Sequence, residues 1–101
     1  MIFEIKQNDT FPPLRLRLTS GGAPANLTGA TINLRITGIG NRTMVVEDAA
    51  HGIIRYDWQA IDTAAVGLFP AEVKVVYPGT ARQTYPTVGQ IEIRIHREVV
   101  V

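Results

Sequence analysis

Histidine is the side chain that most often moves protons near neutral pH, so the two histidines are the first residues to weigh as catalysts. His51 lies in the turn-like stretch DAAHG, and His96 lies on the polar face of the alternating segment QIEIRIHRE. Neither has the spacing of a zinc site or of a nucleophile relay. We therefore expect both histidines to be exposed to solvent and to take no part in catalysis.

Paired carboxylates are the other arrangement that performs acid and base chemistry. The pairs nearest in the sequence are Asp57 with Asp62 and Glu47 with Asp48. Glu47 and Asp48 are expected on opposite faces of a strand. Asp62 begins the stretch DTAAVG, where its short side chain can accept backbone hydrogen bonds and fix a turn. The sequence therefore predicts structural or solvent-facing roles for these carboxylates.

Loops that bind phosphate or metal are also missing from the sequence. TGIGNRT contains a GxG, but it lies between strand-like segments without a following helix or lysine, which predicts a hairpin turn. EDAAHG supplies too few oxygen ligands for calcium. The chain has no cysteine, which removes disulfides, thiolate nucleophiles and Cys-ligated zinc. We expect no metal, no cofactor and no enzymatic activity.

The charge balance points to no class of partner. Ten basic and nine acidic residues give a net charge of +1, with no basic run of the kind that nucleic-acid binding requires. No apolar run approaches the roughly 18 residues of a membrane span, and the start lacks the pattern of a signal peptide. We expect a soluble chain that is made in the cytoplasm, with no nucleic-acid partner and no membrane span.

The elements that position these side chains are predicted to be strands, because apolar residues recur at every second position. In LRLRLTS, the leucines are expected to face inward and the arginines outward. Only WQAIDTAAVG could hold a helical turn, Gly52 is expected at a positive φ, and Pro70 at a strand end, an edge or a bulge. Four further segments are predicted to turn the following residues toward a core: Ile32, Leu34 and Ile36; Ile54, Tyr56 and Trp58; Phe69, Ala71, Val73, Val75 and Tyr77; Ile91, Ile93 and Ile95.

Six to eight short strands separated by turn residues, in a chain of 101 residues, favour a single all-β domain spanning residues 1–101. We predict an antiparallel immunoglobulin-like β-sandwich of about seven strands, with a small β-barrel as the alternative. Arginine accounts for eight of the ten basic residues, and five of these fall on polar strand faces, which favours either a partner-facing sheet or ordinary cross-strand pairing with Asp57 and Glu92. The five are Arg15, Arg17, Arg35, Arg55 and Arg94.

Five stretches, taken in order, cover nearly the whole chain: QNDTFPPLRLRL, GGAPANLTGATINLRI, HGIIRYDW, DTAAVGLFPAEVKVVYPG and TYPTVGQIEIRI. Their order resembles the N-terminal domain family of the phage baseplate upper protein, a module of tail and baseplate proteins in bacteriophages and prophages. The resemblance implies a β-sandwich that docks onto other virion proteins and commonly holds a receptor-binding or fibre part. It implies no enzymatic activity.

The resemblance also implies roles for residues near the join between loop and strand. Asp62 and Thr63 would set a structural turn, Gly67 would allow a close bend, and Phe69 would begin a long strand that the join orients across the sandwich. The family often has glycine where this chain has Asn8. Its members usually continue into a stalk or another domain, whereas this sequence stops after residue 101. We therefore expect a stand-alone adaptor or decoration subunit, or one whose fibre partner is a separate chain.

The leading hypothesis is therefore a structural virion protein of the tail or baseplate that forms homo-oligomers or hetero-oligomers in the particle. Strand edges and exposed apolar residues would make the contacts, because open edges and apolar surface need covering. The residues expected to bind partners are Phe11, Pro12, Pro13, Tyr85, Val99, Val100 and Val101.

Two alternatives share the predicted fold. A small carbohydrate-binding module would need exposed aromatic platforms, for which Tyr85 is the best candidate, since Tyr77 and Trp58 are expected to be buried. A capsid decoration protein would use the same kind of docking surface in another layer of the virion. A hydrolase or a metal enzyme is the least favoured hypothesis.

Overall fold

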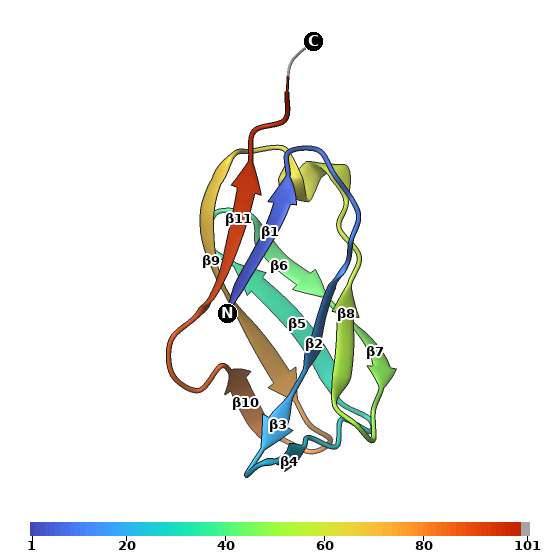
Figure 1. The fold of residues 1–101 in the computed structure, drawn as a ribbon. Coiled ribbons are helices and arrows are strands. Elements are labelled where there is room, and N and C mark those ends of the chain that lie inside the picture. The colour runs from blue at the N-terminus through green and yellow to red at the C-terminus, as the bar shows by residue number, and fades with distance from the viewer. Residues whose placement is uncertain (100–101) are drawn as a thin grey trace.

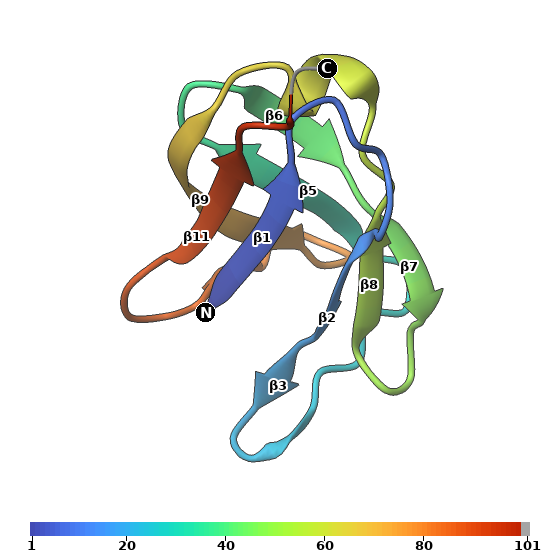
Figure 2. The same cartoon turned by 45° about the horizontal axis from the view of Figure 1, so that its top comes forward.

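The computed structural model describes residues 1–99 as two β-sheets packed face to face (Figures 1 and 2). The larger sheet contains β1 (Ile2–Lys6), β5 (Thr31–Ile36), β6 (Gly40–Thr43), β9 (Gly67–Val76), β10 (Arg82–Tyr85) and β11 (Ile91–His96). The smaller sheet contains β2 (Leu14–Arg17), β7 (Val45–Asp48) and β8 (Ile53–Tyr56). A hairpin of β3 (Thr19–Ser20) and β4 (Ala23–Pro24) follows β2, and one 3-10 turn, η1 (Ala60–Thr63), joins β8 to β9. The predicted all-β sandwich is confirmed.

The strand order is β1-β11-β9-β5-β6 in the larger sheet, with β10 also paired to β9, and β2-β8-β7 in the smaller sheet. The sandwich was predicted to be antiparallel, but β1 lies parallel to β11, with Phe3 opposite Ile93. These strands are far apart in the sequence, so their relative direction is not forced by a hairpin. The structure also has more strands than the expected seven, since several short segments pair.

One of these extra strands corrects the interpretation of TGIGNRT as a turn. The turn itself occupies only residues 37–39, where Gly38 has a φ of 85°. The following residues form β6 and return along β5, so that Gly40 lies opposite Ile36 and Thr43 lies opposite Asn33. A tight turn was therefore correctly expected, but its polar second half belongs to an edge strand.

The alternating pattern correctly located the core, which lies between the two sheets. Leu16, Phe69 and Tyr77 are only partly buried. The residues predicted to face inward that the structure buries are Leu14, Leu18, Ile32, Leu34, Ile36, Ile54, Tyr56, Trp58, Ala71, Val73, Val75, Ile91, Ile93 and Ile95. Because side chains alternate between the two faces of a strand, each strand turns its apolar set toward the facing sheet.

Pro70 lies inside β9, where a proline would ordinarily remove a ladder hydrogen bond. The pairing of β9 with β5 stops at Ala71, and the Thr37 N–H then donates to the Pro70 carbonyl at 2.8 Å. The nitrogen of Pro70 points to the same side as its carbonyl, so the bond that it cannot make is the reciprocal one to Thr37, just past the end of β5. The expected position at the end of a pairing is confirmed on this side of β9.

Gly52 adopts the positive φ that the sequence predicted, at 69°. The position is also crowded, because a Cβ placed there would lie 2.5 Å from the Leu18 carbonyl oxygen and 3.0 Å from that of Ala25. The Leu18 N–H donates to the Gly52 carbonyl at 2.8 Å, which ties this turn to the end of β2. Glycine is therefore required here both for its backbone conformation and for its lack of a side chain.

Candidate docking surfaces

The two histidines lie apart and on the surface. His51 and His96 are both exposed, as predicted; the His51 Nδ1 lies 2.8 Å from an oxygen of Asp48, and the His96 Nε2 lies 3.0 Å from one of Glu4. Within residues 1–99, no group of three or more histidine or acidic residues is placed to hold a metal ion. None of the helices in this part of the chain is long and apolar enough to cross a membrane.

Asp62 is the centre of a buried polar group that we name the Asp62 cluster, made of Asp62, Arg42, Tyr56 and Gln59. The Asp62 side chain is 1% exposed. It accepts hydrogen bonds from the Arg42 Nε at 2.8 Å, from the Gln59 N–H at 2.9 Å and from the Tyr56 hydroxyl. All three partners are donors, which matches a carboxylate that can only accept. Asp62 thus accepts a backbone hydrogen bond within the turn, as expected, and also binds two side chains outside it.

The protonation of Asp62 follows from this environment. Burial acts to raise the pKa of the carboxyl group, but the hydrogen bonds from Tyr56, the Gln59 backbone and Arg42 outweigh it, so the pKa lies below its ordinary value. Burial is also the main reason that the pKa of Tyr56 is raised, with the neighbouring carboxylate adding to the effect. Asp62 is therefore ionised and Tyr56 is neutral near pH 7, the combination that these hydrogen bonds require.

Thr63, the neighbour of Asp62, ties the loop of residues 7–13 to η1. Its hydroxyl donates to the Asp9 carbonyl at 2.8 Å, and its own carbonyl accepts from the Asn8 N–H at 3.0 Å. The Gln7 amide adds a third contact, donating to the Ala64 carbonyl at 2.8 Å. The loop between β1 and β2 is consequently held against the 3-10 turn that the Asp62 cluster stabilises.

Gly67 begins β9 with a φ of 153°, in the range that favours glycine. A Cβ added at this position would lie 3.4 Å from the Phe69 ring, which is a tight contact. Gly67 pairs with Ile95 near the end of β11, so the bend lies where the loop from η1 enters the larger sheet. The join leads into β9, which pairs with β11, β5 and β10.

Segments that bear exposed apolar side chains meet at one end of the sandwich. Figures 1 and 2 show the loop after β1, the turn η1, the start of β9 and the end of β11 at the same end of the sandwich. Four side chains from three of these segments define what we name the docking end: Phe11, 77% exposed, Ile61, 78%, Val66, 42%, and Leu68, 61%. Large apolar groups that face water together are unusual on a monomer and mark contact sites.

Apart from Tyr85 on β10, the predicted partner-binding residues lie at this end where the structure describes them. Pro12 is exposed and Pro13 half-buried, beside Phe11. Val99 is 79% exposed and follows the end of β11, where the Asn8 side-chain amide donates to Glu98 at 2.9 Å. The structure therefore brings the proline-bearing loop and the segment after β11 together. The remaining two predicted contacts, Val100 and Val101, lie outside the described residues.

Tyr85 corrects the expectation of an exposed aromatic platform. Its side chain is 8% exposed, and its hydroxyl donates to Gln83 at 2.8 Å and lies 3.3 Å from the Tyr77 hydroxyl. Tyr85 ends β10, opposite Val73, and this inward parity places its ring in the core. Of the other aromatics, the Tyr56 hydroxyl reaches Asp62, whereas the Trp58 Nε1 has no hydrogen-bond partner among the described residues.

The arginines on the strand faces form ion pairs on the smaller sheet. Glu47 accepts from Arg15 at 3.0 Å and from Arg55 at 2.9 Å, and Arg55 also contacts Asp57 at 2.9 Å. The hydrogen bonds from Arg15 and Arg55 lower the pKa of Glu47. Exposed pairs of this kind contribute little to folding stability, so they are better regarded as a charged surface than as structural supports.

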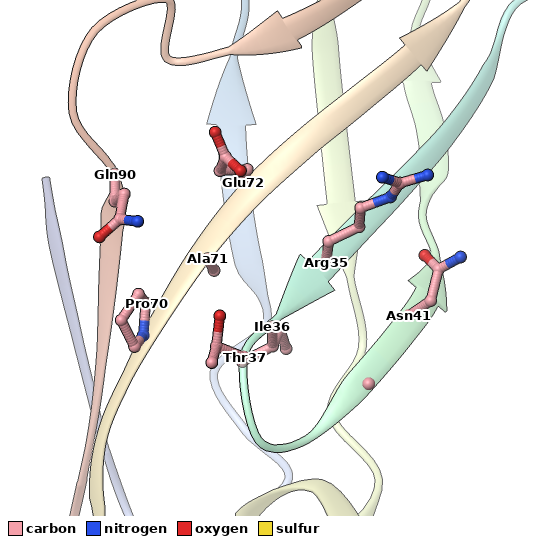
Figure 3. Close-up of a pocket in the computed structure, with 9 residues that line it drawn as sticks. Arg35, Ile36, Thr37, Asn41, Pro70, Ala71, Glu72 and Gln90 are labelled. Atoms are coloured by element: carbon pink, nitrogen blue, oxygen red, sulfur yellow. The ribbon is translucent and has the colours of Figure 1, made fainter.

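Among the other strand-face arginines, Arg94 on the larger sheet has a similar contact. Its guanidinium lies 2.7 Å from Glu92 on the same strand. A depression of about 370 Å³ on the outer face of the larger sheet is lined by Arg35, Glu72 and Gln90 among others (Figure 3). None of its lining residues is aromatic. It therefore lacks the flat apolar surface on which sugar rings commonly stack.

Several surface residues were missed by the sequence interpretation. Ile61, Val66 and Leu68 fall in or next to DTAAVG, where only the turn-forming residues were considered. Leu68 had a usable signal, because it is apolar on the outward parity of β9. Val88 is 87% exposed, an apolar residue within the turn-like stretch YPTVGQ. In contrast, no local signal marks Arg42 as the partner of Asp62.

Comparisons with known proteins support the fold. No protein-family model matches the chain, and no curated protein matches it. The N-terminal domain of phage TP901-1 ORF48 is similar in structure, with a TM-score of 0.67 at 16% identity, covering 98% of this chain and 86% of that one. CopC from Methylosinus trichosporium OB3b gives a TM-score of 0.56 at 13% identity, covering 97% and 86%. At such low identities these similarities show a shared sandwich fold.

Proposed function

We propose that this protein is a structural component of a bacteriophage or prophage virion. It acts as a tail or baseplate adaptor or decoration subunit that docks onto other virion proteins and anchors a fibre or receptor-binding protein. The fold shared with the phage TP901-1 ORF48 domain supports a phage origin. The ordered sequence stretches described above support the same origin. The single observation that carries the docking role is that the segments meeting at one end of the sandwich bear four exposed large apolar side chains.

The docking end has the properties of a preformed contact surface. Phe11 presents a large ring with few rotatable bonds, and rigid aromatic groups lose little entropy when a partner covers them. Its loop is held to η1 through Thr63 and Asn8, and η1 is in turn fixed by the Asp62 cluster. A partner would therefore meet apolar side chains that are already in place. The exposed Val99, beside the same end, adds a further contact.

The test uses Phe11→Ser in the full chain, produced within phage particles. We expect the variant to be incorporated into purified particles at a reduced level, on the order of thirtyfold, because the loss of one buried aromatic anchor costs about 2 kcal/mol of binding. Folding should be unaffected, since the side chain is exposed. Quantitative immunoblotting of particles gives the incorporated amount, and thermal unfolding of the purified protein reports stability.

The matched control is Val45→Ser on β7, an exposed apolar residue that is 45% exposed and lies away from the docking end. This variant should enter particles as the unmodified protein does. Equal incorporation of the Phe11 and Val45 variants would show that the docking end is not the contact surface.

A further inference from the structure

A second apolar surface lies beside the exposed edge of β2. It is a groove of about 400 Å³ between the end of β2 and the loop of residues 86–90. Its floor is formed by Leu16, Leu18, Val73, Tyr85 and Ile91, which belong to both sheets, and its rim includes Met1, Arg17 and Val88. We name this surface the edge groove. Most of its floor is buried, and Leu16 is the partly buried member.

The backbone of β2 makes this groove suited to an extended peptide. β2 pairs with β8 alone, so its other edge has no strand beside it within the described part of the chain. The Leu18 N–H points toward the β8 side, where it donates to the Gly52 carbonyl. Backbone direction alternates along a strand, so the N–H and C=O groups of Arg15 and Arg17 face the open edge. An added strand would find both hydrogen-bonding groups and an apolar floor.

We propose that the edge groove binds the segment of residues 98–101 from a second copy of this chain, as an added strand beside β2. This inference rests on the use of that segment as a contact, as proposed above, and assigns its receptor. The segment reads EVVV, and valine is strongly favoured in strands. Alternation along the added strand sends Val99 toward the groove floor. Val99 is 79% exposed in the isolated chain.

The charges at the edge match this occupant. Arg17 lies on the solvent face of β2, and within residues 1–99 no carboxylate lies within ion-pairing distance of it. Glu98 precedes Val99, so its side chain falls on the outward parity of the added strand. Both charged groups would then lie on the same solvent-facing side, where oppositely charged residues on neighbouring strands attract. Arg17 at the edge thus faces Glu98, the acidic residue directly before the apolar run, while Arg97 lies outside the added strand.

The geometry requires two molecules. β11 starts at Ile91, which lines the groove, and ends at His96, so its six residues carry the chain about 17 Å away along the strand. Figure 1 shows the chain leaving β11 at the end opposite the β10 and β3 region, directed away from the sandwich. Such a contact joins unlike surfaces on two copies. It therefore generates a ring or a filament, according to the rotation between neighbours.

Sedimentation of the full chain tests the proposal. The weight-average mass should rise above the 11.1 kDa of one chain as the concentration increases from about 1 μM to about 500 μM. Replacing all three valines by serine should raise the dissociation constant on the order of tenfold or more, because apolar burial is lost. Val88→Asp, at the exposed rim, should do the same by placing a carboxylate beside the apolar floor. Val45→Ser should behave as the unmodified chain.

Mixing the two weakened variants distinguishes this contact from any symmetric one. The serine variant keeps an intact groove and the Val88 variant keeps an intact segment, so together they should form dimers and nothing larger. A chain that stays monomeric throughout, variants that associate as the unmodified chain does, or a mixture that forms no dimer would each overturn the proposal. Phe11→Ser should leave self-association unchanged, so the docking end and the edge groove are judged separately.

Discussion

Replacing Asp62 by asparagine tests whether the Asp62 cluster holds the docking end of the sandwich together. Asparagine has nearly the same shape, so the change removes the charge and one acceptor without opening a cavity. The three groups that contact Asp62 are all donors. An amide has only one acceptor oxygen, so its NH₂ group must face at least one of these donors. Of the partners, only the Tyr56 hydroxyl can rotate to accept.

The size of the effect follows from the burial of each partner. Breaking a fully buried ion pair costs about 3–5 kcal/mol, but the Arg42 side chain is 30% exposed, and water offsets part of its loss. The asparagine oxygen also keeps one hydrogen bond. We therefore expect the free energy of unfolding to fall by about 2–4 kcal/mol, a large fraction of the stability of a small domain. The melting temperature should drop by about 10–25 °C.

Urea unfolding near pH 7 measures this loss, and Asp57→Asn is the control, because Asp57 accepts from Arg55 in the open, 56% exposed. The control should lose far less stability, because an exposed ion pair contributes little to the free energy of unfolding.

The pH dependence of stability is a second test. The pKa of Asp62 is lower in the folded state than in the unfolded chain, so its contribution is complete above about pH 4 to 5 and is lost as the pH falls through the folded value.

The difference in stability between the unmodified protein and the Asp62 variant should therefore shrink as the solution is acidified. Equal losses from the Asp62 and Asp57 substitutions would refute the reasoning, and so would a difference that stays constant down to pH 2. The urea dependence of the unfolding free energy should be the same for both proteins, which confirms that only stability has changed.

Two further substitutions test the core and the turns. Gly52→Ala should lower the unfolding free energy by about 2 kcal/mol or more, because its Cβ would meet the Leu18 carbonyl at 2.5 Å; thermal denaturation measures this, and an unchanged melting temperature would contradict the crowding described at this turn. Tyr85→Phe should cost about 1 kcal/mol through loss of the hydrogen bond to Gln83, as measured by urea unfolding. A stability equal to that of the unmodified protein would indicate that the Tyr85 hydroxyl is solvated.

The strands and their buried faces were predictable because side-chain direction in a strand repeats every two residues, and apolar residues in this sequence follow that period. In β11, Ile91, Ile93 and Ile95 are all buried and their polar neighbours are not. Gly52 was predictable for a similar reason, since a turn residue at positive φ has few substitutes. Both cases depend on local geometry that a few neighbouring residues specify.

Long-range pairing was less accessible. Nothing near residue 2 indicates that β1 joins β11, or that the two strands run parallel. Tyr85 was misjudged because a polar aromatic before a proline resembles an exposed loop residue, while its burial depends on the pairing of β10 with β9. Arg42 and Asp62 illustrate the same limit. Arg42 lies on the strand that follows one predicted turn and Asp62 lies in another, and only the packing of both sheets brings them to 2.8 Å.

The parallel pairing of β1 with β11 has a mechanical consequence. The chain enters β1 beside Ile2 and leaves β11 after His96, at opposite ends of this strand pair (Figure 1). Tension applied through these two points pulls the strands lengthwise past each other. All the hydrogen bonds between them then bear load at once, rather than separating one by one as in a hairpin opened from its end. A domain attached to other proteins at both points would therefore need a larger force to unfold than its modest thermodynamic stability implies.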